Sequence, residues 1–314
     1  MRIGIIGAGY AGQVHSNVIE RFYPEIEYYI YDVATNEAKE FAKTHKCQAI
    51  ATVEELYDKV DAIIIATPTF THYSLAMEAM GKGKHVLCEK PMSLRLTEAE
   101  EMFKKSKEKN LICMVGFNYR FFEITKIIKT QCQIGKIQHI KVLLKRLFRD
   151  EWHNKENGVL SDLGIHLIDY VTYLCNQSIN LSTCKIKRRY IEDWDYDANV
   201  LGEMENGISF ELTASRIKEI EEVQFSIEVV GEKGIFRYDS RQETKYEIEM
   251  NKIVNTYNFQ KAEITDDFFD FTDSIGRQDN AWIIAISGQN SKNIATFEDG
   301  FRAQKTLEYF LSKN

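Results

Sequence analysis

The sequence predicts an α/β fold of two domains, the first built on a parallel sheet and the second on an antiparallel one. The chain has 314 residues, and roughly 100–200 residues per domain is usual, which suggests two domains. The first third alternates short apolar runs with helix-period segments, whereas much of the second half alternates apolar and polar residues. These two textures are typical of parallel and antiparallel sheets respectively.

Residues 1–118 are predicted to form the parallel domain. Their apolar runs are short and apolar on both faces, as in strands buried between helices. The expected strands are RIGIIG, EYYIYD, DAIIIATP, HVLCEKP and LICMVGFNY, and the expected helices cover residues 10–23, 36–45, 71–81 and 97–109. The last helix is predicted to open with a capping box, because Thr97 is followed three residues later by Glu100.

Residues 119–314 are predicted to form the second, α+β domain. A helical segment through about Ile128 leads to the strand IQHIKVLLKRLF, a helix at VLSDLGIHLIDY, and the strands GISFELTAS, QFSIEVVGEKGIFRYD and KYEIEMNKIVNTYNF. In VVGEKGIF a glycine-flanked turn joins two strand-like runs, which predicts a hairpin. Hairpin connections favour an antiparallel sheet.

The composition is that of a globular protein and argues against several classes of function. A net charge of −7 gives no basic footprint for nucleic acid. The apolar start breaks at Gly7 and has no cleavage site, so we expect neither a signal peptide nor a membrane segment. The six cysteines form no C-x-x-C pair, which favours reduced thiols, no structural metal and a cytoplasmic location.

A glycine-rich turn follows the first expected strand and opens the first expected helix. Gly7, Gly9 and Gly12 have the G-x-G-x-x-G spacing that lets a backbone approach a pyrophosphate at a helix N-terminus. Asp32 ends the second strand, where a carboxylate can bind ribose hydroxyls and repel a 2′-phosphate. The alternative is a plain glycine turn with a capping aspartate. The pattern predicts a dinucleotide site that prefers NAD, although Arg21 or another basic group would make NADP possible.

Two further strand ends carry polar residues. Ala66-Thr67-Pro68 and Cys88-Glu89-Lys90-Pro91 follow neighbouring apolar strands at the edge where open α/β sheets bind ligands. Lys90 is flanked by apolar residues, so we expect its ammonium group to face a cleft. A solvated lysine is the alternative.

The segment VLSDLGIHLIDY places Asp162, His166 and Asp169 at spacings of four and three. On a helix all three side chains project from one face. Buried polar groups must find partners, so this pattern indicates either a polar network or a site. The alternative is a core histidine paired with Asp169.

Taken together, these motifs resemble the Gfo/Idh/MocA oxidoreductases. The resemblance rests on the glycine turn, ATPTFTH (66–72), HVLCEKP (85–91), GFNYRF (116–121), GVLSDLGIHLIDY (158–170) and FEDGFRAQ (297–304). It implies a Rossmann domain, a second domain whose open, largely antiparallel sheet often forms the subunit interface, and hence a homodimer or homotetramer. It also implies catalytic roles for Lys90, Asp162 and His166 in a cleft between the domains.

The resemblance gives the polar pattern of residues 159–170 a chemical interpretation. His166, which titrates near neutrality, is expected to be the acid/base, and Lys90 the electrostatic partner of the substrate oxygen. Asp162 is expected to orient the substrate, and Asp169 to be structural. We expect cofactor contacts from Gly7, Gly9, Tyr10, Ala11, Gly12, Asp32, Thr67, Pro68, His72, Glu89 and Lys90.

Substrate contacts are expected from the catalytic set and from three further residues. Asn118 and Arg120 lie near the cleft in GFNYRF, and Arg149 precedes the helix at 159–170. The alternatives are a structural ion pair for Arg120 and an exposed loop for Arg149.

The predicted function is hydride transfer between nicotinamide and a sugar, cyclitol or nucleotide-sugar. Two alternatives stay open: a redox-neutral, NAD-dependent enzyme that processes glycosides, and a non-catalytic NAD-binding regulator. Retention of Lys90, Asp162 and His166 together disfavours the regulator, which has no need of proton-handling groups.

Overall fold

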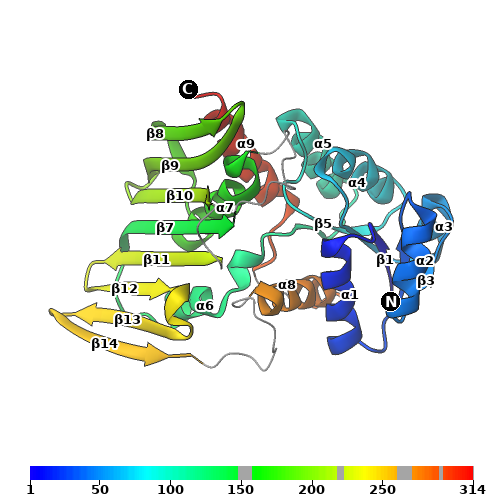
Figure 1. The fold of residues 1–314 in the computed structure, drawn as a ribbon, viewed down its shortest axis with the longest axis horizontal. Coiled ribbons are helices and arrows are strands. Elements are labelled where there is room, and N and C mark those ends of the chain that lie inside the picture. The colour runs from blue at the N-terminus through cyan, green and yellow to red at the C-terminus, as the bar shows by residue number, and fades with distance from the viewer. Residues whose placement is uncertain (148–157, 218–222, 260–270, 290–292, 314) are drawn as a thin grey trace. The chain divides into compact units, whose positions relative to one another are not determined.

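The computed structural model describes residues 1–147, 158–217, 223–259, 271–289 and 293–313. They form two compact units (Figure 1). The first unit contains residues 1–118 and 274–304, and the second contains residues 119–273 and 305–314.

The first unit is built on a six-stranded parallel sheet. Its strands are β1 (Arg2–Ile6), β2 (Glu27–Tyr31), β3 (Gln48–Ala49), β4 (Ala62–Ile65), β5 (His85–Cys88) and β6 (Cys113–Val115), in the order β3-β2-β1-β4-β5-β6. All four residues of β4 are buried, as expected for a strand covered on both faces. The order reverses between β1 and β4, which is where doubly wound sheets bind ligands.

Helices connect these strands. They are α1 (Tyr10–Phe22), α2 (Thr35–Thr44), α3 (Val53–Lys59), α4 (His72–Gly81) and α5 (Leu96–Glu108). The predicted capping box at Thr97 is wrong. Helix α5 begins one residue earlier, its N-cap is Arg95, and no side chain caps it; Arg95 instead pairs with Glu98.

Residues 274–304 belong to the first unit, which differs from the single boundary at residue 118 that the sequence predicted. This segment contains most of α8 (Phe271–Ile286) and the first half of α9 (Phe297–Leu311). Trp282 of α8 is fully buried, and the backbone N–H of Val115 donates to Ala295. The amphipathic pattern of a helix shows which face is buried but not against which sheet.

The second unit is built on an eight-stranded mixed sheet. Its strands are β7 (Ile137–Leu147), β8 (Ile179–Ile191), β9 (Trp194–Met204), β10 (Ser209–Ile217), β11 (Gln224–Gly231), β12 (Gly234–Asp239), β13 (Lys245–Met250) and β14 (Ile253–Asn258). The order is β14-β13-β12-β11-β7-β10-β9-β8, and only β7 and β10 pair in parallel. The predicted α/β fold with a mostly antiparallel second sheet is therefore confirmed, as is the hairpin of β11 and β12.

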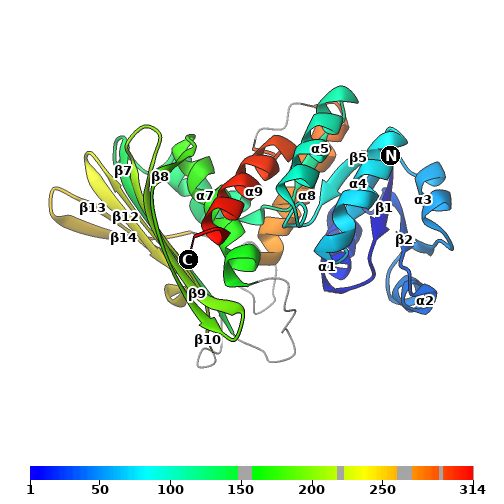
Figure 2. The same ribbon diagram turned by 90° about the horizontal axis from the view of Figure 1, so that it is seen from above.

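Two helices of the second unit follow directly from the sequence pattern. They are α6 (Glu123–Thr130) and α7 (Ile165–Cys175), and a π-helical turn at Leu160–Gly164 leads into α7. Helix α7 lies against one face of the sheet (Figure 2). On that face Ile140, Val142 and Leu144 of β7 are fully buried.

Among the described residues, no helix is long and apolar enough to cross a membrane. All six cysteines are free thiols.

Candidate active site

The glycine turn and Asp32 form one hydrogen-bonded structure in the first unit. The Asp32 carboxylate accepts the N–H of Ala8 and the N–H of Ala34, each at 2.8 Å. It therefore ties the end of β2 to the turn between β1 and α1. A carboxylate has about four lone-pair positions, so Asp32 keeps capacity for ribose hydroxyls.

The glycine positions fit a bound dinucleotide. Gly7 has φ +108°, and a Cβ there would lie 2.5 Å from the carbonyl oxygen of Ala66. A Cβ on Gly12 would lie 2.1 Å from the carbonyl oxygen of Gly7. Above Gly9, by contrast, the space is open. The turn thus packs tightly at its two ends and leaves its middle accessible to a phosphate.

Exposed apolar side chains surround this turn. Tyr10, Val33 and Phe70 follow β1, β2 and β4, and they are 65%, 87% and 65% exposed. Large apolar groups at the carboxyl edge of a parallel sheet suit the flat rings of a dinucleotide. Neither Val33 nor Phe70 was predicted as a site residue, although Val33 directly follows Asp32 and Phe70 lies within ATPTFTH.

His72 is buried and holds two loops together. Its Nδ1 lies 2.8 Å from the carbonyl oxygen of Pro91, and its Nε2 lies 2.8 Å from that of Thr67. Burial lowers the pKa of His72 despite these two carbonyls. A direct cofactor contact from His72 stays a prediction, but both ring nitrogens already face backbone oxygens.

Glu89 and Lys90 lie on the segment that follows β5. The Glu89 carboxylate accepts the backbone N–H of Lys90 at 3.2 Å and lies 3.3 Å from Nε2 of His15. His15 also lies 2.7 Å from Asp279 of α8. His15 was not predicted as a site residue, since the sequence marks it only by its position three residues after the glycine motif.

Asn118, a predicted substrate contact, is buried at the end of the first unit's main segment. Its amide donates to the hydroxyl of Ser274 at 2.8 Å. In the second unit, Arg120 is also buried. It makes two hydrogen bonds to Asp169, at 2.8 Å and 2.5 Å. This is the structural ion pair that was the alternative for Arg120, and it gives Asp169 a partner other than His166.

Asp162 lies in the π-helical turn, where its carboxylate is ion-paired with Arg216 of β10. A π-turn inside a helix is rare and frequently marks functional sites. The sequence predicted a regular helix through this segment because a π-turn changes hydrogen bonding without changing the apolar pattern. Arg216 was not predicted, because it is a charged residue at a position of β10 where the alternation places core residues such as Phe210 and Leu212.

His166 lies on α7, 3% exposed, with its ring centroid 4.8 Å from that of Tyr119. Burial raises the pKa of Tyr119, although the nearby Arg146 acts in the opposite direction. Asp162 lies near enough to the same tyrosine for its negative charge to raise the pKa of Tyr119 further. Arg149 lies outside the described residues.

The start of the π-turn is anchored by Asp195 of β9. Asp195 accepts backbone hydrogen bonds from Val159 and Leu160 and lies 3.6 Å from the guanidinium of Arg188. Burial nevertheless raises the pKa of Asp195, against the effect of these partners. Gly158 makes this approach possible, because a Cβ there would lie 1.6 Å from Asp195 Oδ1.

Two family models match the chain. Residues 1–117 match the model described as oxidoreductase family, NAD-binding Rossmann fold, and residues 123–237 match a GFO/IDH/MocA C-terminal domain. The chain is 32% identical over 341 aligned positions to glucose-6-phosphate 3-dehydrogenase from Bacillus subtilis (strain 168), covering 100% of this chain and 96% of that protein.

Solved structures share the fold at lower identity. The chain resembles UDP-N-acetylglucosamine 3-dehydrogenase from Acidithiobacillus ferrooxidans with a TM-score of 0.85 and 21% identity, covering 99% of this chain and 96% of that one. A levoglucosan dehydrogenase in complex with NADH and levoglucosan gives a TM-score of 0.85 at 19% identity, with coverage of 99% and 96%.

Proposed function

Because the chain belongs to the Gfo/Idh/MocA oxidoreductase family, whose Rossmann domain binds NAD, we propose that it is an NAD-dependent dehydrogenase that oxidises a ring hydroxyl of a sugar. The observation that carries the proposal is the polar set around α7: Asp162 paired with Arg216, and His166 buried four residues later. A purely structural helix has no need of these groups.

In the proposed reaction, a carbinol becomes a carbonyl, its hydride goes to the nicotinamide, and its hydroxyl proton goes to His166. His166 suits this role because imidazole exchanges protons near neutral pH. Lys90 stabilises the negative charge that develops on the substrate oxygen. The Asp162–Arg216 pair orients the substrate: the carboxylate accepts further hydrogen bonds from substrate hydroxyls, and the guanidinium donates further ones.

A panel of sugars with NAD tests this proposal. Glucose 6-phosphate, glucose, myo-inositol and UDP-N-acetylglucosamine are each incubated with NAD, and NADH absorbance is followed. We expect one of them to produce free NADH. His166→Asn and Lys90→Met should each lose roughly 100-fold or more in kcat. NADH binding, measured by fluorescence, should change little, because most of the expected cofactor contacts come from the glycine turn and Asp32. Conversion of a glycoside without release of free NADH would support the redox-neutral alternative. Binding of the cofactor without any turnover would support the non-catalytic regulator.

We propose a phosphorylated sugar as the first substrate class to test. The 32% identical relative is named for glucose 6-phosphate. Arg146 and Arg216 are also direct register partners on the parallel strands β7 and β10, so their side chains leave the sheet on the same face as the core residues that α7 covers. Two guanidinium groups so placed, one of them beside Asp162, suit a phosphate.

The variant Arg146→Met tests the phosphate contact. Losing one charge-assisted hydrogen bond of about 1.5–3 kcal/mol should raise KM for the phosphorylated sugar about 10- to 100-fold. The KM for the unphosphorylated sugar should stay the same. Lys145→Met is the matched control, because the adjacent residue of a strand points to the opposite face. Equal effects of Arg146→Met on both sugars would contradict the assignment.

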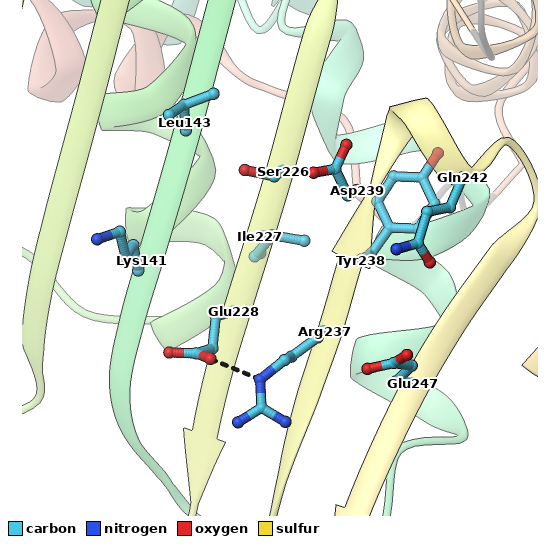
Figure 3. A pocket seen from close by; sticks show the side chains of 10 residues that line it. All are labelled: Lys141, Leu143, Ser226, Ile227, Glu228, Arg237, Tyr238, Asp239, Gln242 and Glu247. Atoms are coloured by element: carbon cyan, nitrogen blue, oxygen red, sulfur yellow. Dashed lines mark hydrogen bonds and ion pairs between the residues drawn. The ribbon is translucent and has the colours of Figure 1, made fainter. Parts of the chain in front are cut away.

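We also propose a homodimer that forms through the sheet face opposite α7, as the family resemblance implies. No described element of the second unit covers that face (Figure 2). It carries an ion pair between Arg237 and Glu228 beside a hollow of about 410 Å³ (Figure 3). Arg237 is also paired with Glu249. Sedimentation should give a dimer or tetramer at micromolar concentration, and Arg237→Glu should weaken it. A monomer throughout would contradict the proposal.

The free thiols support a cytoplasmic location.

A further inference from the structure

Three charged side chains form a hydrogen-bonded series in the first unit, two of them buried and the third, Glu89, 19% exposed. His15 of α1 is 1% exposed, with Nδ1 2.7 Å from Asp279 Oδ2 and Nε2 3.3 Å from Glu89 Oε1. Asp279 is also 1% exposed. These three side chains therefore join α1 and α8 to the segment that carries Lys90.

Geometry alone indicates the charge of His15. A neutral imidazole has one N–H, whereas each ring nitrogen of His15 faces a carboxylate, which accepts but does not donate. Only the imidazolium form donates to both. In keeping with this, the pKa of His15 is raised to about 10: burial lowers it, but Asp279 and then Glu89 outweigh burial. Burial similarly opposes ionisation of Glu89, yet His15 keeps the pKa of Glu89 low.

Among the described residues, other polar groups act on the two carboxylates that flank His15. Gln278 donates to the other carboxylate oxygen of Asp279 at 3.3 Å. Tyr23 is near enough for Asp279 to contribute to the rise in its pKa, after burial. Lys90 acts on Glu89 as a second, weaker cation after His15. Within the described residues, His15 is thus the cation placed directly between the two carboxylates.

The Glu89 carboxylate has little room to move. One oxygen contacts His15 and the other accepts the backbone N–H of Lys90. A Cβ on Gly116 would lie 2.8 Å from the Glu89 carboxylate, and the Glu89 N–H donates to Ile65 at 2.9 Å. Beyond Lys90, the carbonyl of Pro91 contacts His72. The backbone is held on both sides of Lys90.

We propose that His15 is a positioning residue: as the cation between Asp279 and Glu89, it fixes the Glu-Lys-Pro segment and so holds the Lys90 ammonium group at the reacting oxygen. This inference rests on the proposed role of Lys90. His15 is not proposed to contact the substrate. Its charge acts through the Glu89 carboxylate and the Lys90 backbone.

A double-mutant cycle tests this route. His15→Gln removes the positive charge and should lower kcat about 10- to 100-fold, the cost of a small misplacement of a catalytic group, with little change in KM for NAD. In a Lys90→Met background the same change should cost less than about threefold, because the group that His15 positions is already gone. His45→Gln is the matched control, since His45 also lies beside a carboxylate, Glu20, but touches neither Glu89 nor Asp279.

The outcomes separate this inference from the proposed function. An equal loss from His15→Gln in both backgrounds would show a structural role and overturn the inference, while the function would stand. A Lys90→Met variant with wild-type turnover would overturn both. A loss of kcat in His45→Gln as large as that in His15→Gln would also contradict a specific effect of His15 on Lys90.

Nitrogen NMR of the His15 ring tests the inference without an activity measurement. It also does not depend on whether the His15→Gln variant folds. In the wild-type protein we expect both ring nitrogens to stay protonated up to about pH 9, one unit below the pKa of about 10. In Asp279→Asn the second proton should leave at lower pH, and kcat should fall at lower pH in parallel. A singly protonated His15 ring in the wild-type protein at pH 7 would overturn the inference.

Discussion

Asp32 combines two tasks in one carboxylate. It accepts N–H groups from Ala8 and Ala34, and the same negative charge disfavours a 2′-phosphate. Its structural task could not be read from the sequence, because Ala8 is 24 positions away. Its role in cofactor recognition stays a prediction, which rests on the local strand-turn-helix motif.

Cofactor preference should therefore follow the charge of Asp32. Wild-type protein should bind NADH more tightly than NADPH, by about tenfold or more, since facing like charges cost several kcal/mol. Asp32→Ala should reduce the ratio of NADH affinity to NADPH affinity. Asp32→Asn keeps one acceptor for the N–H groups of the turn, so it should reduce the same ratio with a smaller loss of stability. Fluorescence titration measures both affinities. Equal or tighter binding of NADPH by the wild-type protein is the result that would refute the preference.

The polar residues of 159–170 show how far a spacing rule extends. The sequence correctly marked Asp162 and His166 as unusual on an apolar helix. It could not show that Asp169 pairs with Arg120, or that Asp162 pairs with Arg216, because each partner lies on a different element. Spacing identifies which side chains share a face, whereas tertiary packing decides what they meet.

At the scale of the element, the π-turn and its anchor set the start of α7. Asp195 binds the first N–H groups of the turn, and Gly158 provides the necessary space. Neither role was visible in the sequence, since Asp195 belongs to a strand 37 positions later and a single glycine before a helix has several ordinary explanations.

Gly158→Ala should therefore destabilise the protein by about 1–3 kcal/mol, the usual cost of overpacking, and lower kcat by displacing His166. Gly81→Ala is the matched control: Gly81 ends α4 with open space around its Cβ position, so this change should be neutral or slightly stabilising. Urea denaturation measures both. If Gly158→Ala were as stable as Gly81→Ala, Asp195 would not be a close anchor.

At the scale of the whole molecule, His15 should make stability depend on pH. Its pKa rises from 6.5 unfolded to about 10 folded, so folding takes up a proton between these values. The stabilisation is complete below about pH 6.5 and is lost as the pH rises towards 10. The difference in Tm between wild type and His15→Gln should therefore shrink from pH 7 to pH 10. A constant difference over this range would mean that His15 does not carry the extra proton.

The fold class was readable from the sequence because strand and helix periods are local. The assignment of residues 274–304 was not, because it depends on contacts such as His15 with Asp279 and Val115 with Ala295. Both join positions more than 150 residues apart, beyond the reach of any periodic pattern.

The hydrogen bond between Asn118 and Ser274 has one more consequence. Residue 118 ends the first long segment of the first unit and residue 274 resumes it, so the 155 residues between them leave and return at adjacent points. Such an arrangement is that of an inserted domain, and its two ends are held together by this buried hydrogen bond, since Asn118 is 3% and Ser274 0% exposed. Residues 119–273 could thus diversify during evolution, and with them the choice of sugar, while the NAD-binding framework kept its own contacts intact.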